Sequence, residues 1–105
     1  MPKVLTKKRA RTKAAAYDVA EHLRTPDEVA AYLDAWFDEA PDDPAGIAMA
    51  LGNIARARGL AQVAKDSGLS PARLRRALSA NGNPSFATIL IIAKALGIKL
   101  HAGIV

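Results

Sequence analysis

The stretch from residue 60 to residue 86, LAQVAKDSGLSPARLRRALSANGNPSF, constrains the fold of this chain more than any other segment. Gly68 divides it, because glycine readily adopts the left-handed backbone conformation that ends many helices. A first helix is expected over Leu60–Ser67. Beyond the turn, Ser70 can accept hydrogen bonds from free backbone N–H groups, and Pro71 suits the first helical position. The stretch therefore predicts two short helices held at a fixed angle.

The second of these helices is expected to have an apolar face and a basic face. Leu74, Ala77 and Leu78 are spaced by three and four residues, which places them on one side of a helix. Three of the five remaining positions are arginines; these positions are Ala72, Arg73, Arg75, Arg76 and Ser79. Two helices joined in this way are typical of the DNA-binding helix-turn-helix, whose second helix enters the major groove. The alternative is an ordinary helical hairpin with solvated arginines.

Base recognition is expected from Arg75 and Arg76, because a guanidinium group can bind guanine through two hydrogen bonds. Phosphate contacts are expected from polar residues at helix starts and in the turn after the second helix, where free N–H groups also attract anions. The complete predicted DNA-binding set is Ser70, Pro71, Ala72, Arg73, Arg75, Arg76, Asn81, Asn83 and Ser85. The serines and asparagines of this set can equally act as helix caps and turn formers alone.

Charge divides the chain into three blocks. Residues 1–16 carry six basic and no acidic residues, and we expect a disordered N-terminal arm that either lies along DNA or is simply solvated. Residues 17–43 carry nine acidic residues against one arginine, and we expect an acidic helical extension that points away from DNA. Residues 44–105 carry eight basic residues against one aspartate and contain the helix-turn-helix, so this block suits a phosphate backbone.

Three further helix starts are marked in the sequence, at Thr25-Pro26, at Asp43-Pro44 and at Ser85. Glu28 can close a capping box with Thr25. The apolar positions expected to face the core are Val29, Leu33, Trp36 and Phe37, then Ile47, Leu51, Ile54 and Ala55, and finally Ile89, Leu90, Ile92, Ala93 and Leu96. Four or five helices are thus expected to share one core.

The last eight residues, 98–105, alternate apolar and polar side chains with a period of two, which predicts a short C-terminal β-strand. A lone strand leaves its backbone edges unpaired. We therefore expect it to pair either with residues 17–23 or with its own copy across a two-fold axis, and we favour a homodimer.

Composition excludes several classes of protein. The chain has no cysteine, so disulfides and thiolate metal sites are excluded, and its longest apolar run is too short to cross a membrane. Together with the absence of a secretion signal, this predicts a soluble cytoplasmic protein without a membrane partner. His22 and His101 are far apart in sequence, and no nucleophile with a neighbouring base or phosphate-binding loop is present. We expect neither a cofactor nor enzymatic activity.

From about residue 17 to residue 100 the chain resembles the HigA-type addiction-module antidote proteins, or antitoxins, of the Cro/C1-like (Xre-type) helix-turn-helix family. The resemblance rests on the order of five segments: YDVAEHL, VAAYLDAW, ALGNIARARGLAQVAKDSGLS, LRRALSANGNPSFATIL and KALGIKL. It implies an all-α, lambda-repressor-like domain of five helices. It also implies a repressor of its own operon that neutralises a toxin of the RelE/HigB-like fold. The family often has arginine, glutamate and tyrosine where this chain has Pro71, Ala72 and Arg75, so the operator sequence is left open.

The acidic helix expected over residues 26–39 is the candidate site for docking a basic toxin. The predicted contacts are Tyr32, Asp34, Trp36 and Asp38, although a large aromatic residue on a helical stripe more often belongs to the core. Two other functions remain open at this point. One is a phage-type repressor without a toxin, and the other is a helical interaction module that never touches DNA.

Overall fold

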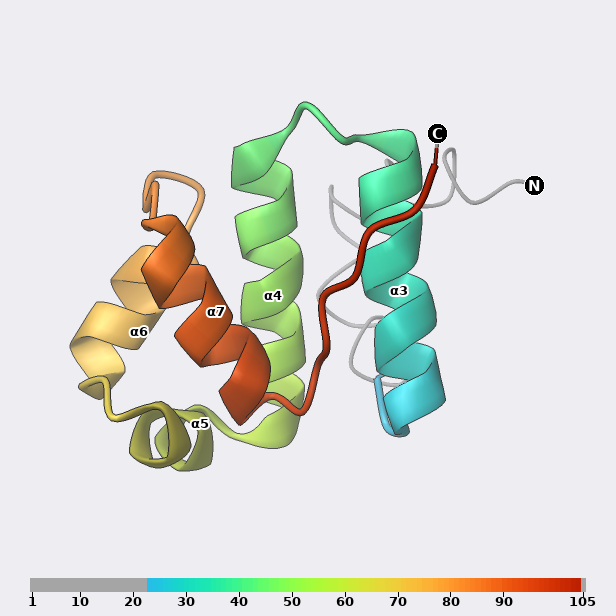
Figure 1. Ribbon diagram of the computed structural model, residues 1–105. Helices are drawn as coiled ribbons and strands as arrows, with labels where there is room; N and C mark the ends of the chain where they lie inside the picture. The colour runs from blue at the N-terminus through green and yellow to red at the C-terminus, as the bar shows by residue number, and fades with distance from the viewer. Residues whose placement is uncertain (1–22, 105) are drawn as a thin grey trace, which may run out of the picture.

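The computed structural model describes residues 23–104, and that part of the chain consists of five α-helices joined by short connections (Figure 1). The helices are α3 (Pro26–Glu39), α4 (Pro44–Arg58), α5 (Leu60–Ser67), α6 (Pro71–Ala77) and α7 (Phe86–Ala95). The expectation of an all-α fold is thus confirmed. The predicted basic arm, residues 1–16, and the first six residues of the predicted acidic extension lie outside the described residues.

The first two helices begin at the residues that the sequence marks. The Thr25 hydroxyl accepts a hydrogen bond from the Glu28 amide at 3.1 Å, and the Glu28 carboxylate accepts one from the Thr25 amide at 3.1 Å, which completes the capping box. A carboxylate oxygen of Asp43 accepts a hydrogen bond from the Gly46 amide at 2.9 Å. Each bond satisfies a backbone donor that has no partner inside its helix.

One hydrophobic core joins all five helices. Figure 1 shows α4 in the middle, with α3 antiparallel on one side, α6 and α7 on the other, and α5 across the lower end. The buried core residues are Leu23, Val29, Leu33, Trp36, Ala50, Leu51, Ile54, Ala55, Val63, Ala64, Leu74, Leu78, Ile92 and Leu96. The acidic helix α3 therefore packs into the same core as the predicted helix-turn-helix segment.

Two glycines set the geometry around α6. Gly68 ends α5 with a φ of 79°, in the left-handed region, and its amide donates a hydrogen bond to the Ala64 carbonyl at 2.9 Å. Gly82 lies against the last turn of α6, where an added Cβ atom would collide with the carbonyl oxygens of Arg76 and Ala77. The loop after α6 can follow that helix closely only because this side chain is missing.

Some of the positions expected in the core are not buried. Phe37 and Leu90 are each 45% exposed, so placing them in the core was wrong. Both lie at the edge of an apolar helical face, and helical spacing alone does not show how far the neighbouring helices cover that edge.

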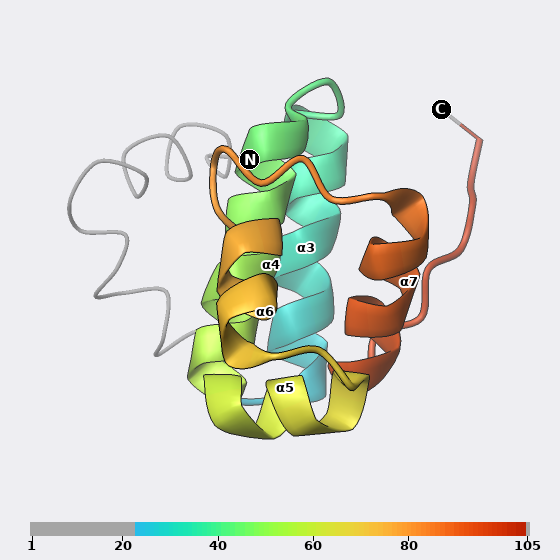
Figure 2. The same ribbon diagram turned by 90° about the vertical axis from the view of Figure 1, so that its left-hand side faces the viewer.

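The expected C-terminal strand is not formed by the described residues, which end at Ile104. The Ile98 amide donates a hydrogen bond to the Ala93 carbonyl at 2.8 Å, but the segment that follows has no strand assignment. Figure 2 shows this segment running outward, away from the helices. A strand requires a partner strand, and the described part of the single chain supplies none.

Candidate nucleic-acid interface

Helix α6 packs one side against the core and leaves the rest of its surface exposed. Leu74 is completely buried, and Leu78, just after the helix, is 3% exposed. Around the rest of the helix Arg73, Arg75 and Arg76 are exposed, Arg73 and Arg75 flanking Leu74 and Arg76 opposite to it, and none of their guanidinium groups has a hydrogen bond or ion pair to another described residue. The packed leucines therefore hold a helix whose three arginines are free to contact a ligand.

The start of α6 is held by its cap. The Ser70 hydroxyl accepts a hydrogen bond from the Arg73 amide at 3.1 Å, and Pro71 occupies the first helical position, as the sequence predicts. Below it, α5 buries Val63 and Ala64, and the small side chain of Ala64 permits a close approach of the two helices. The capping function of Ser70 is confirmed, and its contact with phosphate stays a prediction.

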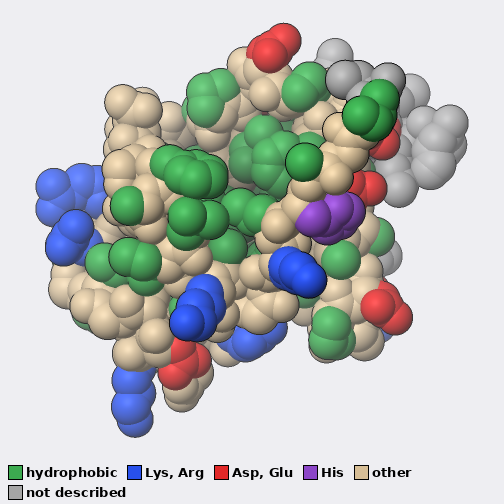
Figure 3. Space-filling model, viewed as in Figure 1, with side chains coloured by type: hydrophobic (Ala, Val, Ile, Leu, Met, Phe, Trp, Pro, Cys, Tyr) green, Lys and Arg blue, Asp and Glu red, His purple; other side chains and the backbone are tan. Residues whose placement is uncertain are grey.

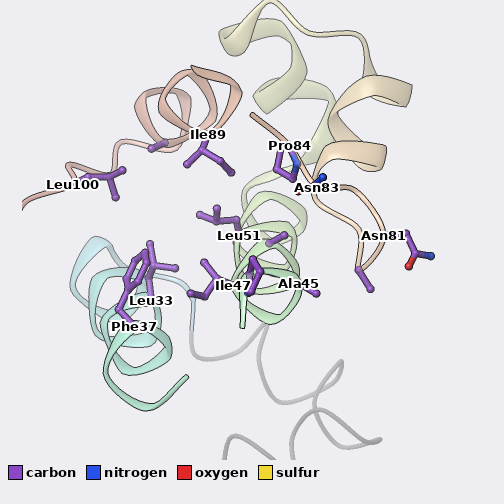
Figure 4. A pocket seen from close by; sticks show the side chains of 14 residues that line it. Leu33, Phe37, Ala45, Ile47, Leu51, Asn81, Asn83, Pro84, Ile89 and Leu100 are labelled. Carbon is purple, nitrogen blue, oxygen red and sulfur yellow. The ribbon is translucent and has the colours of Figure 1, made fainter. Parts of the chain in front are cut away.

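The loop between α6 and α7 carries the other predicted DNA contacts, and Asn81, Asn83 and Ser85 are all exposed. Asn83 has a left-handed backbone with a φ of 46°, a conformation that asparagine tolerates better than most residues. The Ser85 hydroxyl caps α7 by accepting a hydrogen bond from the Thr88 amide at 3.1 Å. Figure 4 shows the Asn81 side chain pointing outward, away from the helices.

All nine predicted DNA-binding residues are exposed, and they belong to one stretch of chain that runs from the N-cap of α6 through the following loop to the N-cap of α7. Figure 2 shows α6 on the side that faces the viewer, unobstructed by the other described helices. In Figure 3 lysine and arginine side chains gather at the left edge, where Figure 1 places α6. The arrangement is therefore a protruding basic helix with capped helix starts beside it.

Two exposed arginines outside α6 make hydrogen bonds to other residues of the chain. Arg56 donates a hydrogen bond to the side-chain oxygen of Asn53 at 2.6 Å. Arg58 donates one to the Leu96 carbonyl at 2.8 Å and so ties the end of α4 to the end of α7. The sequence carried no signal for the second contact, because its two partners are 38 residues apart.

The four predicted toxin contacts on α3 differ in how far they are exposed. Asp34 and Asp38 are exposed, and Tyr32 is half-buried, with its hydroxyl accepting a hydrogen bond from the Asn53 amide group at 3.1 Å. Trp36 is only 3% exposed and belongs to the core, so its assignment as a surface contact was wrong. The exposed aromatic residue of this helix is Phe37, which the sequence analysis placed inside.

A groove that the sequence did not predict opens between α7 with the loop before it on one side and α3 and α4 on the other, with Leu100 at its edge, and we name it the α7 groove. It encloses about 340 Å³. Its lining residues are Leu33, Phe37, Pro44, Ala45, Ile47, Ala48, Leu51, Ala80, Asn81, Asn83, Pro84, Ile89, Ala93 and Leu100. Figure 4 shows Leu33, Leu51 and Ile89 pointing toward one another from three different helices.

Within residues 23–104, no group of three or more histidine, aspartate or glutamate side chains is placed to hold a metal ion. No helix in this range is both long and apolar enough to cross a membrane.

The comparisons with known proteins assign the chain to the antidote proteins of addiction modules. Residues 13–104 match the model of the family described as "Probable addiction module antidote protein", and the chain belongs to this family. A protein of Haemophilus influenzae described as uncharacterized is 46% identical over 85 residues, which cover 81% of this chain and 86% of that protein. No solved structure matches the chain.

Proposed function

We propose that this chain is a sequence-specific DNA-binding regulator, the antitoxin of a type II toxin–antitoxin module that represses its own operon. The observation that carries the DNA-binding part is the exposure of three arginines on α6 that have no partner among the described residues. In this proposal α5 and α6 form a helix-turn-helix of the lambda-repressor type. Arg75 and Arg76 then read base edges in the major groove. Phosphates are held by Ser70, Asn81, Asn83 and Ser85.

The proposed assembly is a homodimer on a near-palindromic operator, because two recognition helices about 34 Å apart reach successive major grooves on one side of DNA. The proposed protein partner is a RelE/HigB-like toxin, bound in the cytoplasm. Membership of the antidote family supports a toxin partner in general. The exposed carboxylates of Asp34 and Asp38 favour a basic one. The activity proposed for this chain is binding, without catalysis of its own.

A footprint on the promoter of the chain's own operon tests the proposal, performed with and without the product of the neighbouring gene. We expect protection of two half-sites about one helical turn apart, and a changed footprint when the second protein is added. An unprotected promoter at micromolar protein would contradict DNA binding. Protection that the neighbouring gene product leaves unaltered, together with no complex between the two proteins, would contradict the antitoxin assignment and favour a repressor without a toxin.

A further inference from the structure

Three polar side chains form a hydrogen-bond network that joins α3 to a surface arginine of α4. The Asn53 side-chain amide donates a hydrogen bond to the Tyr32 hydroxyl oxygen at 3.1 Å, and the Asn53 side-chain oxygen accepts one from a guanidinium nitrogen of Arg56 at 2.6 Å. Tyr32 and Asn53 are half-buried, whereas Arg56 is exposed. The network therefore runs from the contact between two helices to a cation at the surface.

The orientation of Asn53 is fixed by its two partners. A guanidinium group can only donate hydrogen bonds, so the side-chain oxygen of Asn53 must face Arg56 and its amide group must face Tyr32. A half-turn of the carboxamide would lose both bonds. An arginine side chain gives up much rotational freedom when a ligand immobilises it, and Asn53 removes part of that freedom in advance. Arg56 is thus held in place by the fold itself.

The residue that holds Arg56 carries no charge. Among the described residues Arg56 makes this one hydrogen bond and no ion pair, so its positive charge is not compensated there. An aspartate in place of Asn53 would hold the guanidinium group equally well, but it would cancel the charge. A neutral partner leaves the other guanidinium N–H groups and the full charge available to an anion. This combination suits a binding site for an external anion better than a contact that only stabilises the fold.

Arg56 lies next to the end of the proposed recognition helix. A Cβ atom added to Gly52 would lie 3.0 Å from the Leu78 carbonyl oxygen and 3.6 Å from the other terminal guanidinium nitrogen of Arg56. Leu78 is the C-cap of α6, so the guanidinium group is close to the point where α4 passes that end. In Figure 2 α4 lies immediately behind α6. A duplex whose major groove admits α6 has its phosphate backbones along both sides of that helix, close to a flanking group of this kind.

We propose that Arg56 binds a DNA phosphate beside α6, and that Asn53 and Tyr32 are positioning residues for this contact. The inference rests on the proposed DNA binding by α6, and it adds a phosphate ligand from a helix outside the helix-turn-helix. A guanidinium group matches a phosphate in geometry, because two of its N–H groups can point at two phosphate oxygens. Such a contact carries no sequence information, so it strengthens binding to all duplexes and helps to fix the orientation of α6 in the groove.

Arg56→Gln tests the phosphate contact, with Lys94→Gln as the matched control. Both variants remove one exposed positive charge, but Lys94 is in the last turn of α7, a helix that lies apart from α6 in Figure 2. Fluorescence anisotropy measures binding of the full chain alone to a promoter duplex at salt concentrations from about 50 to about 200 mM. We expect Arg56→Gln to lower the affinity about tenfold. The slope of log affinity against log salt should become shallower by about 0.9 for each bound copy of the chain, and Lys94→Gln should leave it unchanged.

Two further variants test the positioning residues. Tyr32→Phe keeps the ring and removes the hydroxyl, so we expect an affinity about two- to fivefold lower with the salt slope retained, because the phosphate contact is still made at a greater entropic cost. In the Arg56→Gln background the same change should have no effect, since both residues act through one contact. Asn53→Asp keeps a partner for Arg56 and should retain thermal stability, measured by circular dichroism, but it should lower the affinity and flatten the slope as Arg56→Gln does.

An affinity and a salt slope for Arg56→Gln equal to those of Lys94→Gln would overturn the inference. It would also be overturned by full affinity of Asn53→Asp, by an effect of Tyr32→Phe that is the same with and without Arg56, or by a loss of affinity in Arg56→Gln that merely follows a loss of helix content. The wild type separates these failures from failure of the proposed function. Promoter binding by the wild type with unaffected variants refutes the role of Arg56 alone, and no binding by the wild type refutes both.

Discussion

Gly82 illustrates how single residues position the basic helix. It lies in contact with the carbonyl oxygens of Arg76 and Ala77, in the last turn of α6, and its missing side chain lets the following loop pass close by. The φ of Gly82 is not positive, so the requirement here is space and not backbone conformation. Pro84, two residues further on, then leads the chain into the capped start of α7.

Replacement of Gly82 by alanine is therefore expected to lower the free energy of unfolding by about 1–3 kcal/mol, because the new methyl group must displace backbone atoms. Urea denaturation followed by circular dichroism measures this change. Gly103→Ala is the control, since an added Cβ atom at this exposed position would meet nothing within 4 Å. Equal free energies of unfolding for the two variants would show that the chain accommodates a methyl group at Gly82 without loss of stability.

Arg76 and Asn83 are expected to affect DNA binding in different ways. Arg76→Ala should reduce the ratio of operator to non-operator affinity by about 5- to 150-fold, the equivalent of about 1–3 kcal/mol for one bidentate base contact. Asn83→Gly keeps a residue that accepts the φ of 46° and removes only the side chain, so it should weaken binding to both DNAs alike. Fluorescence anisotropy with the two duplexes measures both ratios. An unchanged ratio for Arg76→Ala would remove this residue from base recognition.

At the scale of the helices, the helix starts could be predicted from neighbouring residues, whereas the contacts between helices could not. The starts at Thr25, Asp43, Ser70 and Ser85 follow from a side-chain acceptor and the three residues after it, and all four caps are observed. The left-handed Gly68 was predictable for the same reason. Burial of individual aromatic residues depends instead on which helices meet. The apolar spacing of α3 placed both Trp36 and Phe37 in the core, and only Trp36 is buried there.

The candidate site shows the same division. Exposure of all nine predicted DNA-binding residues could be read from the apolar spacing of α6 and from the turn residues that follow it. The α7 groove could not, because its lining comes from α3, α4, the loop between α6 and α7, α7 itself and the C-terminal segment, most of which are distant in sequence. A strand at the C-terminus was a reasonable inference from alternation, but strand formation depends on a partner that the described residues do not contain.

The exposed acidic side of α3 is predicted to contribute to the affinity for the toxin. Reversal of charge in the double variant Asp34→Lys/Asp38→Lys should lower the affinity for a basic partner by at least tenfold, because attraction becomes repulsion at two positions. Co-purification and titration calorimetry with the neighbouring gene product measure this loss. Asp66→Lys on α5 is the matched control, since this aspartate is also exposed but lies on a different helix. Unchanged affinity of the double variant would place the toxin elsewhere.

At the scale of the whole molecule, the acidic and the basic parts of the chain lie on two sides of one core. Residues 44–105 have a net charge of +7, and residues 17–43 one of −8. Helix α3 and helix α6 lie on opposite sides of α4 in Figure 1, so a duplex bound to α6 is kept away from the acidic helix. A small chain can in this way hold DNA and a basic protein at the same time with little repulsion between its own surfaces.

The salt dependence of promoter binding tests the central claim most directly, because each phosphate contact releases counterions and steepens the fall of affinity with salt. Anisotropy titrations measure the affinity for the chain's own promoter at salt concentrations from about 50 to about 200 mM, the range over which phosphate contacts are strongly salt-dependent. They compare the wild type with the triple variant Arg73→Ala/Arg75→Ala/Arg76→Ala. We predict tight, steeply salt-dependent binding by the wild type, and weaker binding with a visibly shallower slope by the triple variant. Weak binding that salt does not alter, or identical curves for the two proteins, would contradict recognition of DNA by α6.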